Sequence, residues 1–192
     1  MAKNIYFCKQ RHNEKPQKMS KFTESLLKVK AFIFDVDGVL GSDKVLLFPE
    51  GDLLRTMNIK DGFAMQYALK KSYKIAVITG GYSESVHKRF LNLGITDIYL
   101  KSQRKMKDYE DFIKKYALND TEILYMGDDL PDLEVMQRAG VPTCPKNAAT
   151  EICLIAKYIS DKSGGDGAVR DVIEKVLKKQ GKWMDDDVIL SW

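Results

Sequence analysis

The chain has few of the residues that build zinc sites and disulfide frameworks, and it has no long apolar run. Its 192 residues include three cysteines and two histidines, and Cys8, Cys144 and Cys153 show no CxxC spacing. Zinc binding and structural disulfides are therefore not expected. We expect the thiols to be reduced and the protein to be cytoplasmic. No apolar run approaches the roughly 20 residues that cross a bilayer, so we expect no membrane partner.

Charge of one sign is not in large excess. The chain has 31 basic and 27 acidic side chains, and its net charge of +4 comes from residues spread along the sequence. We therefore predict no nucleic-acid partner. Residues 1–28 contain basic side chains but lack the apolar stretch of a signal peptide, and we interpret them as a loosely attached extension.

Strand-like and helix-like segments alternate within residues 29–181, which we predict to form one domain, followed by a tail at 182–192. Continuous apolar runs, typical of parallel strands that are covered on both faces, lie at residues 31–35, 74–80, 97–101, 122–127, 141–144 and 158–160. Helices are predicted at about 61–68, where Asp61 is the expected cap, and at 83–93, 105–116, 131–138 and 167–180. This alternation predicts an α/β fold with a Rossmann-like, doubly wound parallel sheet.

One segment breaks the alternation between the first and second strands. Residues 44–49 and 53–60 are largely apolar and flank a Pro-Glu-Gly-Asp turn. This pattern predicts a β-hairpin that projects beyond the first strand.

Acidic residues follow two of the predicted strands. They are Asp35 and Asp37 after the first strand, and Asp128, Asp129 and Asp132 after the fourth. Ligands of open α/β sheets bind at the carboxyl ends of the strands, where these side chains converge. Their mutual repulsion calls for a cation, and hard carboxylate oxygens suit Mg²⁺.

Groups that can hold a phosphate are predicted at the same edge of the sheet. The hydroxyl of Thr79 and the backbone N–H groups of glycine turns at Gly38 and Gly80 are suitable donors. Lys105 lies in the lysine-rich stretch 101–107 and is the candidate cation, although a solvated basic run is the alternative interpretation. The residues therefore predict a site for a metal ion and a phosphate.

Four motifs in this order resemble those of the haloacid dehalogenase superfamily. They are DVDGVL at 35–40, ITG at 78–80, Lys105 and GDDLPD at 127–132, and the resemblance extends over about residues 31–180. It implies a phosphatase in which Asp35 is the nucleophile that forms an aspartyl-phosphate and Asp37 is the general acid and base.

The resemblance also implies a ligand set. Mg²⁺ would be held by Asp35, the carbonyl of Asp37 and Asp128, with Asp129 and Asp132 beyond its direct ligands. Thr79 and Lys105 would bind the transferring phosphoryl group, together with the backbone at Gly38 and Gly80.

The usual insertion points for a cap domain are too short here. About 40 residues separate Asp37 from Thr79, and about 25 separate Thr79 from Lys105. We therefore predict no cap domain. This short form with a hairpin resembles the phosphatases of 3-deoxy-D-manno-octulosonate 8-phosphate, which are cytoplasmic homotetramers serving lipopolysaccharide precursor synthesis. The GGDGAVRD segment at 164–171 is similar to one in that group.

That resemblance implies three substrate-binding residues, Asp61, Arg89 and Arg170, for a small phosphorylated sugar acid. Arg89 would reach the site of a neighbouring subunit and pair with the sugar-acid carboxylate, with a plain surface role as the alternative. The tail after Gly164 would help close a neighbour's site. The alternative is that Gly164, Gly165 and Gly167 only form a flexible link to the last helix.

Two residues depart from the group's pattern and leave the substrate open. Asp171 stands where glutamate is common, and Gly81 stands where many relatives carry arginine and nonulosonate phosphatases carry glutamate. A nonulosonate 9-phosphate or another small phosphate ester is the alternative substrate. The alternative of another class is a non-catalytic assembly module on the same fold.

Overall fold

The computed structural model describes residues 21–49 and 53–185. Its centre is a six-stranded parallel sheet with the order β5-β4-β1-β6-β7-β8, which confirms the predicted α/β fold. The strands are β1 (Ala31–Phe34), β4 (Lys74–Ile78), β5 (Asp97–Tyr99), β6 (Ile123–Met126), β7 (Val141–Cys144) and β8 (Tyr158–Ile159). The strand order reverses at β1, which pairs with β4 on one side and β6 on the other.

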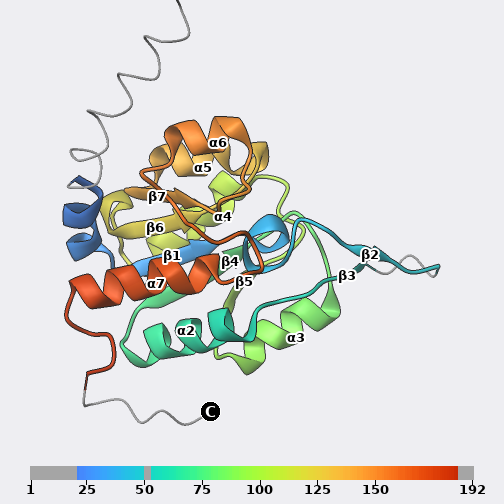
Figure 1. Ribbon diagram of the computed structural model, residues 1–192, viewed down its shortest axis with the longest axis horizontal. Coiled ribbons are helices and arrows are strands. Elements are labelled where there is room, and N and C mark those ends of the chain that lie inside the picture. Colours follow the sequence, from blue (N-terminus) through green and yellow to red (C-terminus); the bar gives the residue numbers. More distant parts are fainter. Residues whose placement is uncertain (1–20, 50–52, 186–192) are drawn as a thin grey trace, which may run out of the picture.

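Helices cover both faces of the sheet, because side chains of one strand point alternately to opposite faces (Figure 1). Phe32 and Phe34 of β1 pack in one core with α2 (Ile59–Lys70), α3 (Glu84–Asn92) and α7 (Ala168–Lys179). Ala31 and Ile33 pack in the opposite core with α4 (Lys105–Lys115), α5 (Leu133–Arg138) and α6 (Thr150–Ile155). All four residues of β1 are buried, as its continuous apolar run predicts.

The predicted hairpin is present but shorter than expected. Its paired strands are β2 (Leu46–Leu47) and β3 (Leu53–Leu54), and an isolated bridge between Gly41 and Met57 lies at its base. Figure 1 shows the hairpin projecting away from the body of the molecule. Residues 50–52 of the expected turn lie outside the described residues. The prediction that the second arm extends to residue 60 is wrong, because α2 already begins at Ile59.

The prediction that Asp61 caps its own helix is also wrong. Asn58 is the N-cap of α2, and its side chain accepts a hydrogen bond from the backbone N–H of Lys60 at 2.8 Å. Asp61 lies in the first turn and is buried, and its carboxylate accepts from the backbone N–H of Arg170 at 2.7 Å. Asp61 therefore connects α2 to the first turn of α7.

The packed body extends beyond the predicted limits of 29 and 181. Phe22 and Leu26 are buried in the core, and the Phe22 ring stacks on Tyr158 with centroids 4.7 Å apart. In the tail, the Trp183 ring packs against Tyr67 at 4.9 Å. The remainder of the predicted extension (1–20) and of the tail (186–192) lies outside the described residues. No helix in the described part of the chain has the length and apolar character that a bilayer crossing requires.

We expect Asp61→Ala to lower the free energy of unfolding by about 1–3 kcal/mol, because it leaves backbone N–H groups in the first turn of α7 without their acceptor. Urea titration followed by circular dichroism measures the loss. Asp166→Ala is the matched control, since Asp166 is an exposed aspartate next to the same helix, and its change should stay within about 0.5 kcal/mol. Equal losses in the two variants would contradict the assigned role of Asp61.

Candidate active site

The turn after β1 positions the first two aspartates. Asp35 follows β1 in an extended conformation, and its carboxylate accepts a hydrogen bond from the backbone N–H of Val36 at 2.7 Å. The following turn, Val36–Leu40, contains Gly38 with a φ of +81°, a conformation that favours glycine. A Cβ atom on Gly38 would lie 2.0 Å from Oδ2 of Asp128. Gly38 therefore lets the carboxylate of Asp128 approach the turn.

Lys105 forms ion pairs with two carboxylates of the site, those of Asp35 and Asp132. It is the first residue of α4, its side chain is only 6% exposed, and its Nζ lies 2.8 Å from Oδ2 of Asp35 and 2.7 Å from Oδ1 of Asp132. The hydroxyl of Tyr125 donates to the same oxygen of Asp132 at 2.5 Å. Desolvation works against the charge of Lys105, yet the facing carboxylates hold its pKa above the usual value. Lys105 is thus a buried ammonium group beside the predicted nucleophile.

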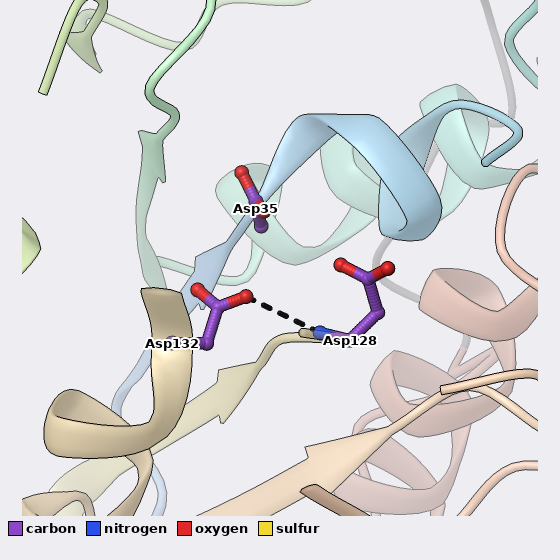
Figure 2. Close-up of side chains that lie close together, drawn as sticks. All are labelled: Asp35, Asp128 and Asp132. Carbon is purple, nitrogen blue, oxygen red and sulfur yellow. Dashed lines mark hydrogen bonds between the residues drawn. The ribbon is translucent and has the colours of Figure 1, made fainter. Parts of the chain in front are cut away.

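Three carboxylates lie around one small volume. Asp35, Asp128 and Asp132 each offer one oxygen, and these oxygens lie within 4.8 Å of one another. Figure 2 shows the three side chains gathered there, with the Asp132 carboxylate hydrogen-bonded to the backbone nitrogen of Asp128 at 3.3 Å. Because Asp132 already accepts from Lys105, Tyr125 and Asp128, it is suited to brace the cluster rather than to bind a metal ion directly.

The electrostatics of this cluster favour a divalent cation. Burial, with the neighbouring Asp132 carboxylate, raises the pKa of Asp35 to about 6. Burial, followed by the charges of Asp35 and Asp132, raises the pKa of Asp128 to about 7. Ionised carboxylates in such a place are unfavourable without a cation, and their oxygens suit Mg²⁺. The donor set therefore fits the predicted metal, which Asp35 and Asp128 would hold through their side chains.

Asp37 has a partner that no motif indicated. Nε of Arg55 donates to Oδ1 of Asp37 at 2.5 Å, and Nη2 donates to Oδ2 at 2.9 Å. Arg55 follows β3 in the hairpin, which brings it to a residue 18 positions away in the sequence. An arginine directly after the apolar pair Leu53 and Leu54 was the sequence signal that could have drawn attention to it.

The predicted phosphate-binding groups line the same cavity, which has a volume of about 680 Å³. Thr79 is buried at the end of β4, and its hydroxyl accepts from the backbone N–H of Gly81 at 3.2 Å. The exposed Asp129 also lies on the wall. The structure brings together these predicted site residues around the cavity: Asp35, Asp37, Gly38, Thr79, Gly80, Lys105, Asp128, Asp129 and Asp132.

The three predicted substrate-binding residues do not line the cavity within the described part of one chain. Asp61 bonds to the start of α7, as described above. The guanidinium of Arg170 pairs with Glu174 at 2.6 Å and lies over the ring of Trp183. Arg89 lies against α2, because a Cβ atom on Gly62 would be 2.8 Å from its Nη2. Their roles toward a substrate remain predictions, and that of Arg89 involves a second subunit.

The glycine segment before α7 supports the turn that follows Asp35, the predicted nucleophile. A Cβ atom on Gly164 would lie 1.8 Å from the carbonyl oxygen of Gly38, and the backbone N–H of Gly165 donates to the carbonyl of Val39 at 2.9 Å. The backbone N–H of Gly164 donates to the side chain of Asn147 at 3.0 Å. This segment is therefore packed in place, which argues against the alternative of a flexible link.

Comparisons with known proteins agree with this geometry. A haloacid dehalogenase-like hydrolase family matches residues 84–173. A hydrolase of the same superfamily from Legionella pneumophila, of subfamily III A, superimposes with a TM-score of 0.85 at 32% identity, covering 88% of this chain and 93% of that chain. The parallel sheet, the carboxylate cluster with Lys105 and the absence of a cap in the described residues define a capless haloacid dehalogenase-like hydrolase.

Curated relatives narrow this class. The 3-deoxy-D-manno-octulosonate 8-phosphate phosphatase of Escherichia coli K12 is 34% identical over 154 residues, 80% of this chain and 82% of that protein. A crystal structure of the Moraxella catarrhalis enzyme of that name contains magnesium, phosphate and KDO. It gives a TM-score of 0.83 at 32% identity, and the match covers 86% of this chain and 95% of that chain. The chain belongs to the 3-deoxy-D-manno-octulosonate 8-phosphate phosphatase family.

The carboxylate cluster predicts that a rise in pH lowers the stability of the metal-free protein and increases the stabilisation by added Mg²⁺. The pKa values of Asp35 and Asp128 are raised above their ordinary value of 3.8. Their contribution to stability is therefore complete below about pH 4 and is lost as the pH rises through about 6 to 7. We expect the Tm of the metal-free protein to fall between pH 5 and pH 8, and added Mg²⁺ to raise the Tm more at pH 8, where protons no longer compete.

Differential scanning fluorimetry with and without Mg²⁺ measures both effects. Asp128→Asn removes one of the two predicted side-chain ligands and should reduce both the fall of Tm with pH and the response to Mg²⁺. A response to Mg²⁺ of equal size at both pH values, or one retained in Asp128→Asn, would contradict a metal site formed by these carboxylates.

Proposed function

We propose that this protein is a Mg²⁺-dependent phosphatase that hydrolyses 3-deoxy-D-manno-octulosonate 8-phosphate to the free sugar acid and phosphate. The observation that carries the proposal is the buried contact of 2.8 Å between Lys105 and Asp35 at the wall of the cavity, with Asp37 two residues further on. Membership of the family named above supports the choice of substrate. The proposed place of action is the cytoplasm, in the synthesis of lipopolysaccharide precursors.

Each half of the reaction uses the two aspartates of the turn after β1. A carboxylate oxygen of Asp35 attacks phosphorus, the bond from phosphorus to the sugar oxygen breaks, and Asp37 donates a proton to that oxygen. A water molecule then attacks phosphorus in the aspartyl-phosphate, Asp37 accepts the proton from the water, and the Asp35 carboxylate is released with inorganic phosphate. Asp35 and Asp128 would hold Mg²⁺, which would offset the negative charge of these carboxylates and of the phosphoryl group.

The remaining cavity residues orient the reacting groups. Val36 and Lys105 hold the two oxygens of the Asp35 carboxylate, which fixes the direction of attack. The ammonium group of Lys105 also lies where it can offset the charge of a phosphoryl group bound to Asp35. Thr79 and Gly80 line the cavity and can donate hydrogen bonds to phosphate oxygens. Asp132 contributes by holding Lys105 in place.

The exposed hairpin supports assembly into the proposed homotetramer. Leu46 is 65% exposed and Leu47 is 77% exposed, and Phe48, Leu53 and Leu54 are also exposed. Contiguous apolar side chains of this kind mark interaction surfaces. Neighbouring subunits joined through the hairpins would supply the cover that a cap domain provides elsewhere, and would allow Arg89 of one subunit to approach the cavity of another.

Asp35→Asn should reduce turnover of 3-deoxy-D-manno-octulosonate 8-phosphate by at least about a thousandfold, because the amide is a poor nucleophile. Phosphate release measures the activity, and circular dichroism checks that the variant is folded. Asp43→Asn is the matched control, since Asp43 lies at the cavity wall outside the carboxylate cluster. Normal turnover by Asp35→Asn would exclude the mechanism, and a panel with nonulosonate 9-phosphates and other sugar phosphates tests the substrate.

Leu47→Asp should dissociate the oligomer, because it places a charge in the proposed interface between hairpins. Sedimentation equilibrium gives the mass of the particle, and the far-ultraviolet spectrum of the dissociated subunit should remain unchanged. Leu154→Asp on α6 is the matched control, since Leu154 is 66% exposed and lies away from the hairpin. A wild-type protein that sediments as a monomer, or an unchanged mass for Leu47→Asp, would contradict assembly through the hairpins.

A further inference from the structure

Arg55 is a buried cation that the catalytic steps above do not use. Its side chain is 6% exposed, whereas that of Asp37 is 39% exposed. Nη1 donates to the backbone carbonyl of Leu53 at 3.0 Å, while Nε and Nη2 donate to the two oxygens of Asp37. The hairpin backbone therefore fixes one side of the guanidinium group, and the other side faces Asp37.

The contact with Asp37 places Arg55 beside the leaving group. Asp37 has to touch the ester oxygen in order to donate a proton to it, so the sugar must lie against the Asp37 carboxylate. Gly81 lines the cavity at this point, and a Cβ atom there would lie 3.2 Å from Nη2 of Arg55 and 3.3 Å from Oδ2 of Asp37. Because Gly81 has no side chain, no atom of this residue separates the cavity from these two groups.

The existing contact bears on how Asp37 meets the substrate. Both oxygens of Asp37 accept hydrogen bonds from Arg55, and Oδ2 is better placed to carry a proton toward the ester oxygen when Nη2 turns to another acceptor. A sugar oxygen that enters beside Gly81 can accept from Nη2 in place of Oδ2 of Asp37. Guanidinium groups bind carboxylate and hydroxyl oxygens well, and their fixed fork makes the geometry selective.

We propose that Arg55 is a specificity-determining residue, which binds an oxygen of the leaving sugar acid through Nη2 and thereby frees Oδ2 of Asp37 for the ester oxygen. This inference rests on the proposed function, since it concerns the same site and its substrate. It assigns a substrate-recognition role to the base of the hairpin, outside the four motifs. For substrates whose leaving group cannot contact Arg55, this residue should not raise kcat/KM.

Steady-state kinetics of Arg55→Ala with two substrates tests this role. For 3-deoxy-D-manno-octulosonate 8-phosphate, kcat/KM should fall by at least about tenfold, mostly through a higher KM, because a charge-assisted hydrogen bond to the sugar is lost. For p-nitrophenyl phosphate, whose leaving group has no sugar oxygens, kcat/KM should change by less than about threefold. Arg55→Lys keeps the charge without the fork and should recover only part of the loss.

Calorimetry with the free sugar acid provides a measurement that does not depend on turnover. Arg55→Ala should weaken the binding of the sugar acid by about the same factor by which it lowers kcat/KM. Lys44→Ala is the matched control, since Lys44 is an exposed cation on the first arm of the same hairpin, and it should change neither quantity. Equal losses for both substrates would overturn the proposal, because Arg55 would then act only on Asp37 or on the hairpin. Unchanged kinetics would overturn it as well.

Failure of this inference is distinguishable from failure of the proposed function. If the wild-type protein does not hydrolyse the sugar-acid phosphate, the proposed substrate is wrong. If it does, and Arg55→Ala treats both substrates as the wild type does, only the role of Arg55 is wrong.

Discussion

The contact of Lys105 with Asp35 and Asp132 is the constraint on which the site depends. These residues come from the start of α4, the end of β1 and the turn before α5, so the contact forms only when the parallel sheet aligns three strand ends. Three carboxylates face one ammonium group here, and complete ionisation leaves two negative charges. A buried cluster with this imbalance is unfavourable by itself, and one divalent cation balances it.

Close backbone contacts connect the packed core to the turn that follows Asp35, the proposed nucleophile. Gly164 packs on Gly38, and Gly38 in turn lies against the Asp128 carboxylate. The segment that contains Gly164 leads directly into α7, whose first turn is held by Asp61 of α2. The helix layer on one face of the sheet thus supports the turn after β1, while α4 and α5 on the other face supply Lys105 and brace Asp132. Both layers have to be in place before the reacting groups are aligned.

The strands and the residues at their ends were predictable because both follow local patterns. A fully buried parallel strand such as β1 needs a continuous apolar run, and the chemistry of an open α/β sheet lies just after it. The failures involve contacts between distant segments. Asp61 has the chemistry of a helix cap, but its acceptor oxygen serves α7, more than 100 residues later. Arg55 reaches Asp37 only through the path of the hairpin, and no spacing in the sequence encodes that path.

The hairpin connects two properties that would be separate in a protein with a cap domain. Its arms expose the apolar side chains of Leu46 and Leu47, and its base holds the guanidinium of Arg55 against Asp37. In the proposed homotetramer, a neighbouring subunit that buries the arms would restrict the hairpin, and Arg55 is bonded to the hairpin backbone through Leu53. The proposed assembly and the position of Asp37, the proposed acid–base residue, would therefore be linked through this hairpin. A chain without a cap would in this way use its own oligomer to order the site.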